Sequence, residues 1–366
     1  MEVRFFRITE RELLLDSIKK LWSENHIYVR NPAVLEHLVL NTPYRAAFAG
    51  EENYSFLGAW DQGEVVGLQG IIPQEANLAG ERGLSSTGTV WVVTPRARKE
   101  GIGLLFMRFF EQGGRDMQVS IGLSPTSYGI YKLLNNLVLE DLPRWIAVNR
   151  VRETVENLLP NDGALPYLPR VTPRELRTNY KIQVDALDAE KWDAFYSGRF
   201  APMTIGTCRD DKFLRWRYME SPVLRYHFLT LCDEAGSYHG LAVVRIEPIL
   251  NGRFTIGRIL EFIAVEAEAS VALANAVVNF DRDVLMWDFY CLSDITAFGL
   301  EAVGFRRLPA WMDHVMMPTR FQPVDYEQLK LNVAIWLSER ARKKLEPLNS
   351  SQWYITKGDA DQDRAN

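Results

Sequence analysis

Four prolines fall close together near the middle of the chain, at positions 160, 166, 169 and 173. Proline lacks a backbone N–H and clashes with the preceding turn of a helix, so no regular element can run through this stretch. The stretch predicts a linker over 156–176, with a folding unit on either side. The length of 366 residues agrees with two units, because domains usually hold about 150 residues each.

The two flanks of this linker carry the same order of strand-like and helix-like patterns. In 1–155 we expect strands over 55–60, 64–72, 87–93 and 117–123 and a helix over 101–112. In 177–322 we expect strands over 226–231, 240–246, 258–265 and 284–291 and a helix over 267–280. The repeated order predicts an α/β fold made by internal duplication.

The C-terminal part is predicted to lie outside both units. Residues 323–356 include an amphipathic stretch with a basic end, which suits the negative end of a helix dipole, so a terminal helix is expected there. Residues 357–366 are polar, and we expect them to form a disordered tail.

Composition excludes several classes of protein. A net charge of −5 disfavours a nucleic-acid partner, and no apolar run approaches the roughly 20 residues of a membrane span. The N-terminus lacks the apolar core of a secretory signal. Three distant cysteines and the absence of a close histidine pair predict neither a disulfide framework nor a metal site. We therefore expect a cytoplasmic protein without a bound metal, and a homodimer is left open.

The strongest site signal is the segment 90–103, Val-Trp-Val-Val-Thr-Pro-Arg-Ala-Arg-Lys-Glu-Gly-Ile-Gly. Here a strand runs into a basic turn that opens a helix. Gly101 and Gly103 let the backbone approach a ligand closely, and the N–H groups at a helix start favour a pyrophosphate. Three basic side chains, Arg96, Arg98 and Lys99, add positive charge beside it.

This segment resembles motif A of the GNAT acyltransferase superfamily, through the pattern Arg98-x-x-Gly101-x-Gly103 after a strand. The segment 130–134, Ile-Tyr-Lys-Leu-Leu, resembles the tyrosine segment of that family, although Asn135 and Asn136 stand where the family has Gly-Phe. The resemblance covers about 1–150. It implies two tandem GNAT-like domains, each a central, mixed, mostly antiparallel sheet flanked by helices.

The resemblance also implies an acyl-CoA co-substrate, either acetyl-CoA or a longer acyl-CoA, held by the first domain. The residues it assigns to this role are Val92, Val93, Arg96, Arg98, Lys99, Glu100, Gly101, Ile102 and Gly103. At the matching place in the second half, 265–269 reads Val-Glu-Ala-Glu-Ala. Its two carboxylates would repel a pyrophosphate, so 177–322 is predicted to be a degenerate copy on the acceptor side.

A second segment, 213–222, reads Phe-Leu-Arg-Trp-Arg-Tyr-Met-Glu-Ser-Pro. It is similar to a pattern in two-domain GNAT-like proteins encoded with bacterial surface-polysaccharide genes, a group associated with N-acylation of nucleotide-linked amino sugars. Arginine suits a diphosphate, and an aromatic face suits a base or sugar ring. The competing interpretation is a structural helix with a buried tryptophan. The candidate substrate-binding residues are Thr89, Trp91, Arg215, Trp216, Arg217 and Tyr218.

Amide formation needs a proton acceptor for the amine, a donor to the thioester carbonyl and an acid for the leaving thiolate. The resemblance implies that the N–H groups of Val92 or Val93 polarise the carbonyl and that Tyr131 protonates the sulfur. For the base, Glu75 is a candidate carboxylate, and Ser86 could position a water molecule. Glu261 lies in an apolar run, so it is either buried and paired or faces a cleft.

The predicted function is acyl-CoA-dependent N-acyl transfer to an amine. The preferred acceptor is a nucleotide-linked amino sugar of surface-polysaccharide biosynthesis. One alternative is an aminoacyl-tRNA-dependent enzyme of the kind that builds peptidoglycan bridges. The other is a non-catalytic module that binds a nucleotide or a sugar.

Overall fold

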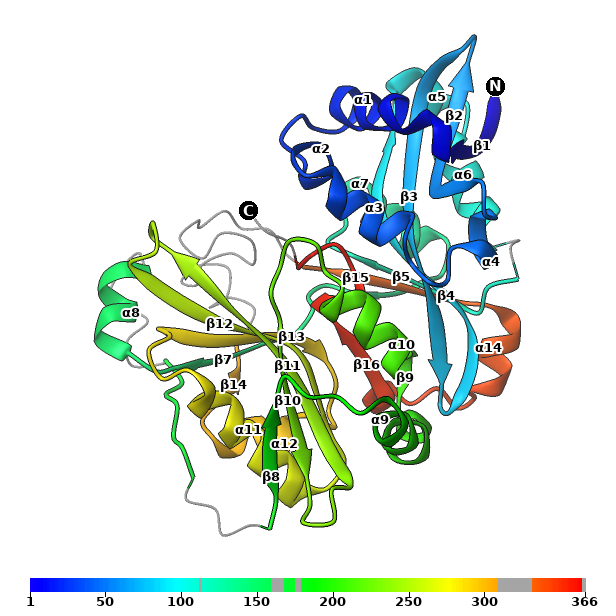
Figure 1. Cartoon of the computed structure of the whole chain (residues 1–366). Coiled ribbons are helices and arrows are strands. Elements are labelled where there is room, and N and C mark those ends of the chain that lie inside the picture. The colour runs from blue at the N-terminus through cyan, green and yellow to red at the C-terminus, as the bar shows by residue number, and fades with distance from the viewer. Residues whose placement is uncertain (112–113, 159–167, 175–178, 309–330, 364–366) are drawn as a thin grey trace.

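The computed structural model describes residues 1–111, 114–158, 168–174, 179–308 and 331–363. Two lobes lie side by side, with the segment around β9 and β16 between them (Figure 1). We call the lobe built on β1 to β5 the first lobe and the lobe built on β8 and β10 to β13 the second lobe. Parts of the predicted linker and domain ends, at 159–167, 175–178, 309–330 and 364–366, lie outside the described residues.

The first lobe contains an antiparallel sheet that ends in a parallel pair. Its strands are β1 (Glu2–Arg7), β2 (Asn53–Asp61), β3 (Glu64–Leu78), β4 (Glu81–Val93) and β5 (Met117–Ile121). The β2–β3 hairpin turns at Gln62 and Gly63, which both have a positive φ, as a tight hairpin turn requires. The hairpin and strand order predicted from the sequence are confirmed.

Short helices cover this sheet. They are η1 (Ile8–Glu10), α1 (Arg11–Leu21), α2 (Ile27–Arg30), α3 (Pro32–Val39), α4 (Ala46–Ala49), α5 (Pro95–Lys99), α6 (Ile102–Glu111) and α7 (Pro125–Leu133). Ser124 begins α7 by accepting a hydrogen bond from the N–H of Ser127, with proline at the first helical position. Among the described helices, none is long and apolar enough to cross a membrane.

The second lobe repeats this arrangement. Its strands are β8 (Lys181–Val184), β10 (His227–Cys232), β11 (Tyr238–Ile249), β12 (Phe254–Ala264), β13 (Met286–Leu292) and β14 (Arg306–Arg307). Its helices include α8 (Val151–Leu158), α9 (Ala189–Phe195), α11 (Ala267–Phe280) and α12 (Ala297–Ala302). β12 and β13 are parallel, like β4 and β5 of the first lobe, so the predicted repeat of the strand order is confirmed.

Each lobe contributes one strand to the other. β7 (Arg144–Val148) follows the first-lobe strands in sequence but lies between β13 and β14 of the second lobe. In the same way, β15 (Val333–Leu337) comes from the C-terminal part and lies between β5 and β6 (Leu137–Leu139) of the first lobe. The predicted boundary after residue 155 therefore does not divide the strands into two sets, because the chain crosses between the lobes twice.

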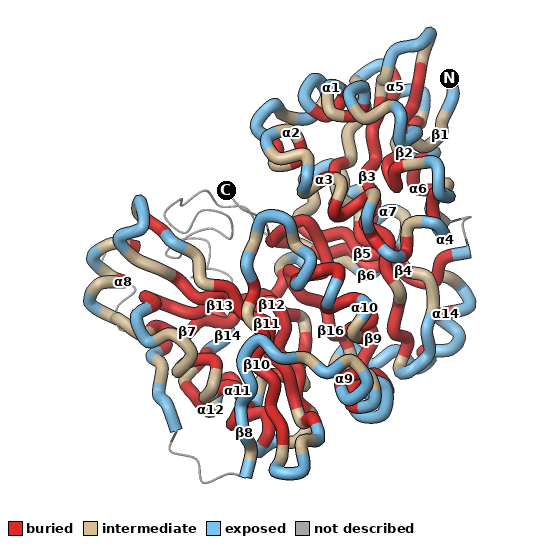
Figure 2. The backbone as a smooth tube through the Cα atoms, viewed as in Figure 1, coloured by how far each residue is buried: buried red, intermediate tan, exposed pale blue. Residues whose placement is uncertain are grey.

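A continuous ladder joins the lobes. β9 (Ile205–Thr207) pairs with β3 and with β16 (Trp353–Thr356), and β16 pairs with β13, so sixteen described strands form one connected sheet. Buried backbone runs through this junction in Figure 2. The remaining short elements surround it: η3 (Tyr196–Phe200), η4 (Ala201–Met203), α10 (Asp211–Leu214), η5 (Arg215–Met219) and η6 (Ser350–Gln352).

The predictions for the C-terminal part are wrong within its described residues. We expected one helix over 323–356. The described part of this range instead contains β15, the six-residue helix α14 (Glu339–Lys344) and β16, in that order. In place of a disordered tail, residues 357–363 begin with η7 (Lys357–Asp359) and are all buried. We call residues 357–363 the C-terminal strap. Polar composition suggested exposure, but inside the protein Lys357, Asp359 and Asp363 form ion pairs and Asp361 accepts hydrogen bonds.

His37 on α3 lies at the contact of the first lobe with η5. Its side chain is 8% exposed, its ring packs against that of Trp216, and its Nε2 has no hydrogen-bond partner in the described structure. Burial, together with the nearby positive charge of Arg217, lowers the pKa of His37 from 6.5 to about 4. The folded protein therefore keeps this ring neutral.

We predict that acid weakens the fold through His37. Below the unfolded pKa of 6.5 the unfolded chain binds a proton that the folded chain does not, so the free energy of unfolding falls as the pH falls. Between pH 7 and pH 5 the loss is roughly 2 kcal/mol. Urea unfolding between about pH 7 and about pH 5 measures it. His37→Phe should lose less stability over this range, and equal losses in the two proteins would contradict the prediction.

Candidate active site

A break in strand pairing opens a pocket in the first lobe. β4 pairs with β5 from Ser85–Met117 to Gly88–Ser120, and the described pairing goes no further. On the other side of β4 the register with β3 shifts between Gln69 and Ile71, a bulge that leaves Thr89 and Val90 opposite the single residue Gly70. A bulge bends and twists its strand, so β4 turns away from β5 at this point.

A pocket of about 420 Å³ occupies this gap. One wall is β4 from Gly88 to Trp91, and another is the chain from Ser120 to Pro125. Trp22 and His26 of the helical cover, Gln69 of β3, Ser127 and Tyr131 of α7, and Asp361 and Gln362 of the strap complete the lining. The pocket is therefore built by the first lobe and closed by the C-terminal strap.

The glycine turn lies beside this pocket. Gly101 has a φ of +79°, and a Cβ there would meet nothing within 4 Å, so the space before α6 is open. A Cβ at Gly103 would lie 3.5 Å from Cζ2 of Trp91, which lines the pocket. The first turn of α6 presents unpaired N–H groups and the positive end of its dipole to this space. The arrangement suits an anion that is linked to a group inside the pocket.

The basic side chains of the turn differ in what they contact. Arg96 is 76% exposed and lies 3.2 Å from Asp61 and 3.7 Å from Glu100. Arg98 donates to the backbone carbonyl of Val93 at 3.3 Å, and Lys99 is exposed. Of the other predicted residues, Val92 and Val93 pair with β3, and the side chain of Ile102 is buried in the core. Asp61 and Glu100 partly neutralise the charge of Arg96. Arg98 and Lys99 are therefore the stronger candidates for contacting an anion.

Tyr131 and Ser120 face the pocket together. The Tyr131 hydroxyl lies 2.8 Å from Oγ of Ser120, and its ring packs edge-on against Trp91 at 5.8 Å between ring centres. Burial raises the pKa of Tyr131 to about 12, and the hydrogen bond with Ser120 opposes this shift only in part. The hydroxyl therefore stays protonated at neutral pH and can donate a proton.

Asp361 was missed by the sequence analysis because the tail was predicted to be disordered. Its Oδ2 accepts a hydrogen bond from Oγ1 of Thr89 at 2.7 Å, and the same Oγ1 lies 3.1 Å from the hydroxyl of Tyr28. Gln362 donates to the carbonyl of Ile121 at 3.2 Å and to Oδ1 of Asp361 at 3.1 Å. One signal in the sequence could have indicated an ordered segment: aspartate recurs at every second position, at 359, 361 and 363. A solvated tail has no reason to keep such a regular pattern.

Two polar atoms of the pocket lining have no hydrogen-bond partner within the described structure. They are Oε1 of Gln69 and Nε1 of Trp91, one acceptor and one donor, which lie on paired positions of β3 and β4. A buried polar group left unpaired costs about 1–3 kcal/mol, so a ligand that supplies the missing partners gains that amount. Gln69 was not among the predicted site residues.

The candidate bases from the sequence lie elsewhere. Glu75 forms an ion pair with Arg82, which also contacts Asp210 at 2.7 Å. Ser86 is fully buried within β4, where it pairs with β3 and β5. Neither residue lines the pocket.

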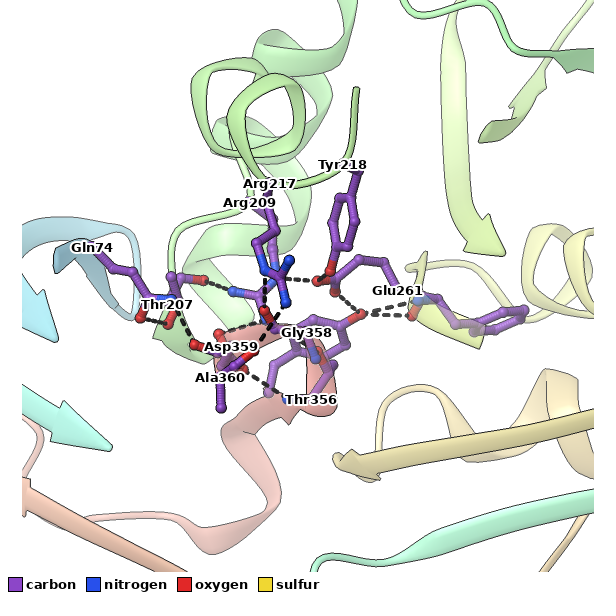
Figure 3. Close-up of polar contacts among 12 residues, drawn as sticks. Gln74, Thr207, Arg209, Arg217, Tyr218, Glu261, Thr356, Gly358, Asp359 and Ala360 are labelled. Atoms are coloured by element: carbon purple, nitrogen blue, oxygen red, sulfur yellow. Dashed lines mark hydrogen bonds and ion pairs between the residues drawn. The ribbon is translucent and has the colours of Figure 1, made fainter. Parts of the chain in front are cut away.

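Glu261 is also outside the pocket and belongs to a buried cluster (Figure 3). Its Oε1 accepts hydrogen bonds from Nε of Arg209 at 2.8 Å and from the hydroxyl of Tyr218 at 2.6 Å. Its Oε2 accepts one from the hydroxyl of Tyr354 at 2.8 Å. Burial raises the pKa of Glu261, and the charge of Arg209 opposes that shift. Of the two interpretations open from the sequence, the buried and paired one describes this residue.

The segment predicted to bind a nucleotide is a structural element. Trp216, Arg217 and Tyr218 are 2–3% exposed, and Nε1 of Trp216 donates to the carbonyl of His37 at 3.0 Å. Arg215 is exposed and pairs with Asp211. None of the four lines the pocket, whereas Thr89 and Trp91 do. The residue types and spacing of 215–218 suited a nucleotide-binding segment and a structural helix equally well. Only the packing in the folded protein decides between these two interpretations.

Among the described residues, no group of three or more His, Cys, Asp or Glu side chains is arranged to hold a metal ion.

Comparisons with known proteins identify the fold. No protein-family model matches the sequence, and no curated protein matches it. A structure from Enterococcus faecalis V583, described as a conserved protein of unknown function and probable N-acyltransferase, matches at 14% identity with a TM-score of 0.52. The match covers 78% of this chain and 64% of that one, so this chain spans less than two thirds of that protein's length.

Two other structures match over more of the chain. A GCN5-related N-acetyltransferase from Anabaena variabilis ATCC 29413 has 12% identity and a TM-score of 0.52, over 92% of this chain and 72% of that one. Saccharomyces cerevisiae N-myristoyltransferase, solved with bound myristoyl-CoA, has 11% identity and a TM-score of 0.50, over 92% and 78%. At such identities the likeness is one of fold. This chain has the GNAT fold, with a large, mostly antiparallel sheet flanked by helices.

We predict that Glu261→Gln destabilises the protein by roughly 3 kcal/mol, because a buried guanidinium loses the charge of one of its two carboxylate partners. Urea unfolding without any ligand measures the loss. Glu234→Gln, at an exposed turn position, is the matched control and should leave the midpoint unchanged. A Glu261→Gln protein as stable as the wild type would contradict the structural role.

Proposed function

We propose that this protein is an N-acyltransferase that transfers an acyl group from an acyl-CoA to a compact amine in the pocket between β4 and β5. The observation that carries the proposal is that the glycine turn before α6 adjoins that pocket: a Cβ at Gly103 would lie 3.5 Å from the side chain of Trp91, which lines the pocket. An acyl-CoA has its pyrophosphate at one end and its thioester at the other, and these two features match the two parts of the site.

The residues present fit the anionic part of an acyl-CoA. The first-turn N–H groups of α6, the open space at Gly101 and the exposed charges of Arg98 and Lys99 would hold the pyrophosphate. The thioester supplies an activated carbonyl. Beyond Gly88 the described β4 has no β5 partner, so alternate backbone N–H groups on that side can donate to the carbonyl oxygen.

Asp361 and Tyr131 suit the two proton transfers. The carboxylate of Asp361, held by Thr89, would accept a proton from the incoming amine. The nitrogen then bonds to the carbonyl carbon while the carbon–sulfur bond breaks. The protonated hydroxyl of Tyr131, next to Ser120, would donate a proton to the leaving thiolate. An ammonium acceptor loses two protons in all. The first, taken by Asp361 before the attack, passes to solvent, and the second leaves the nitrogen after the carbon–nitrogen bond forms and balances the proton that the thiol gains.

The charges of the lining favour a compact cationic acceptor. Asp361 is the acidic side chain among the described lining residues, and none of those residues is Lys or Arg. A nucleotide-linked amino sugar carries two phosphates that need cations. Of the two arginines expected to bind them, Arg217 is buried away from the pocket, and the exposed Arg215 pairs with Asp211 and does not line the pocket. We therefore place compact amines ahead of nucleotide-linked amino sugars as acceptors.

A bulky side chain at Gly103 tests the donor site. We predict that Gly103→Trp weakens acyl-CoA binding by roughly tenfold or more, because the new ring must fill the space between α6 and Trp91. Calorimetry with acetyl-CoA and a longer acyl-CoA measures the affinity. Gly198→Trp, at an exposed position of η3 with open space around it, is the control. Equal affinity in Gly103→Trp and the control would remove the donor site from this turn.

Tyr131 and Asp361 test the proton transfers. Tyr131→Phe and Asp361→Asn should each lower kcat by roughly 10²-fold, the size of a typical general acid or base contribution, and leave the KM for acyl-CoA nearly unchanged. Thiol release measures the rate, with compact primary amines and nucleotide-linked amino sugars as the two acceptor sets. Full activity of either variant would remove that residue from the mechanism, and faster turnover of the nucleotide-linked set would reverse the acceptor assignment.

A further inference from the structure

The C-terminal strap carries four charged side chains and none of its seven residues is exposed. Ordering a free segment costs about 1–2 kcal/mol per residue for the backbone alone, so the strap needs strong contacts to stay in place. Those contacts come from both lobes and from the segment between them. The strap's position is therefore set by partners that lie far from it in sequence.

Arg217 contacts the strap's backbone at two carbonyl groups (Figure 3). Its Nε donates to the carbonyl of Gly358 at 2.8 Å, and its Nη2 donates to the carbonyl of Ala360 at 2.9 Å. These two carbonyls lie on either side of Asp359, and the second lies directly before Asp361. The forked guanidinium can bind two carbonyls at once, which a lysine ammonium on a single stem cannot match in geometry.

Further contacts hold the strap on both sides of the two hydrogen bonds from Arg217. Arg209 lies 2.8 Å from Asp359, and Gln74 of the first lobe donates to the carbonyl of Asp359 at 2.7 Å. At the far end, Arg245 donates to Asp363 at 2.7 Å, and the hydroxyl of Tyr226 donates to the same carboxylate at 2.7 Å. Burial would raise the pKa of Asp363, but the charges of Arg245 and Lys357 outweigh it, so this carboxylate stays ionised.

The path of the strap leaves no room for adjustment at Gly358. A Cβ there would lie 2.1 Å from the hydroxyl of Tyr218 and 3.2 Å from Oε1 of Glu261, so the backbone is pressed against the buried cluster. Gly358 and Ala360 are held on one side of Asp361, and Asp363 is held on the other. These contacts fix the backbone position of Asp361. Its side chain lines the pocket, where Thr89 donates to it.

We propose that Arg217 is a positioning residue, which fixes the strap through the carbonyls of Gly358 and Ala360 and so holds Asp361 in the pocket of the first lobe. This inference rests on the proposed function, because it takes Asp361 as the proton acceptor. The chemistry of the first lobe then depends on a residue that contacts neither substrate.

The test combines amide hydrogen exchange with kinetics on the full chain. In Arg217→Lys, exchange of the amides in 357–363 should rise while exchange in α6 stays as in the wild type. We expect kcat to fall roughly 10- to 100-fold, because a misplacement of about 1 Å costs that much, with the KM for acyl-CoA unchanged. Unchanged protection of the strap, or an unchanged kcat, would overturn the proposal.

A double variant separates positioning from general damage. If Arg217 acts through Asp361, Arg217→Lys combined with Asp361→Asn should be no slower than Asp361→Asn alone. A structural role would instead add its own loss to that of Asp361→Asn. Multiplied losses in the double variant would therefore contradict the proposal.

Two further variants, each of which removes a single hydroxyl group, provide the test if Arg217→Lys does not fold. Tyr226→Phe removes one hydrogen bond to Asp363 and keeps the ring, whereas Tyr238→Phe removes a buried hydroxyl whose partner is the N–H of Asp188. Strap exchange should rise and kcat should fall in Tyr226→Phe relative to Tyr238→Phe, and equal behaviour would count against the proposal. If the wild type binds no acyl-CoA, the proposed function fails, while the exchange data still decide whether these residues hold the strap.

Discussion

Charges buried between the lobes need partners, and the pairing around Arg209 is the constraint on which the rest of the structure depends. Its guanidinium has no exposed surface and lies 2.8 Å from both Glu261 and Asp359. Taking these groups out of water costs several kcal/mol each, a cost that only close pairing and further hydrogen bonds can offset. The three residues come from the segment after β9, from β12 and from the strap. The cluster therefore forms only when all three parts are in place.

This constraint joins the lobes into one functional unit. β7 and β15 cross between the lobes, β9 and β16 extend the sheet through the junction, and the strap then brings Asp361 to the pocket. The second lobe keeps the topology of the first but has carboxylates where the first has a glycine turn. Its role in the proposed mechanism is to hold the strap rather than to bind a second donor.

Local patterns were enough to select the residues of the proposed donor site. The turn before α6 and the tyrosine on α7 each belong to a short, continuous segment of the chain, so the resemblance to family motifs could point to both. Spacing could not assign Glu261, Trp216 or Arg217, because a buried ion pair and an exposed binding group use the same residue types. The partners that decide between the two, Arg209, His37 and the carbonyls of the strap, lie far away in sequence.

The amino-acid sequence by itself determined the four central strands of each lobe, the helix between the third and fourth of them, their repeated order and the glycine turn, since periodicity and turn chemistry act over short distances. The tertiary structure alone decided which lobe each crossing strand joins and whether a charged segment is solvated or buried. Asp361 shows why. A carboxylate in a polar tail has no preferred place until long-range partners offset the cost of burying it, and these partners exist only in the folded protein.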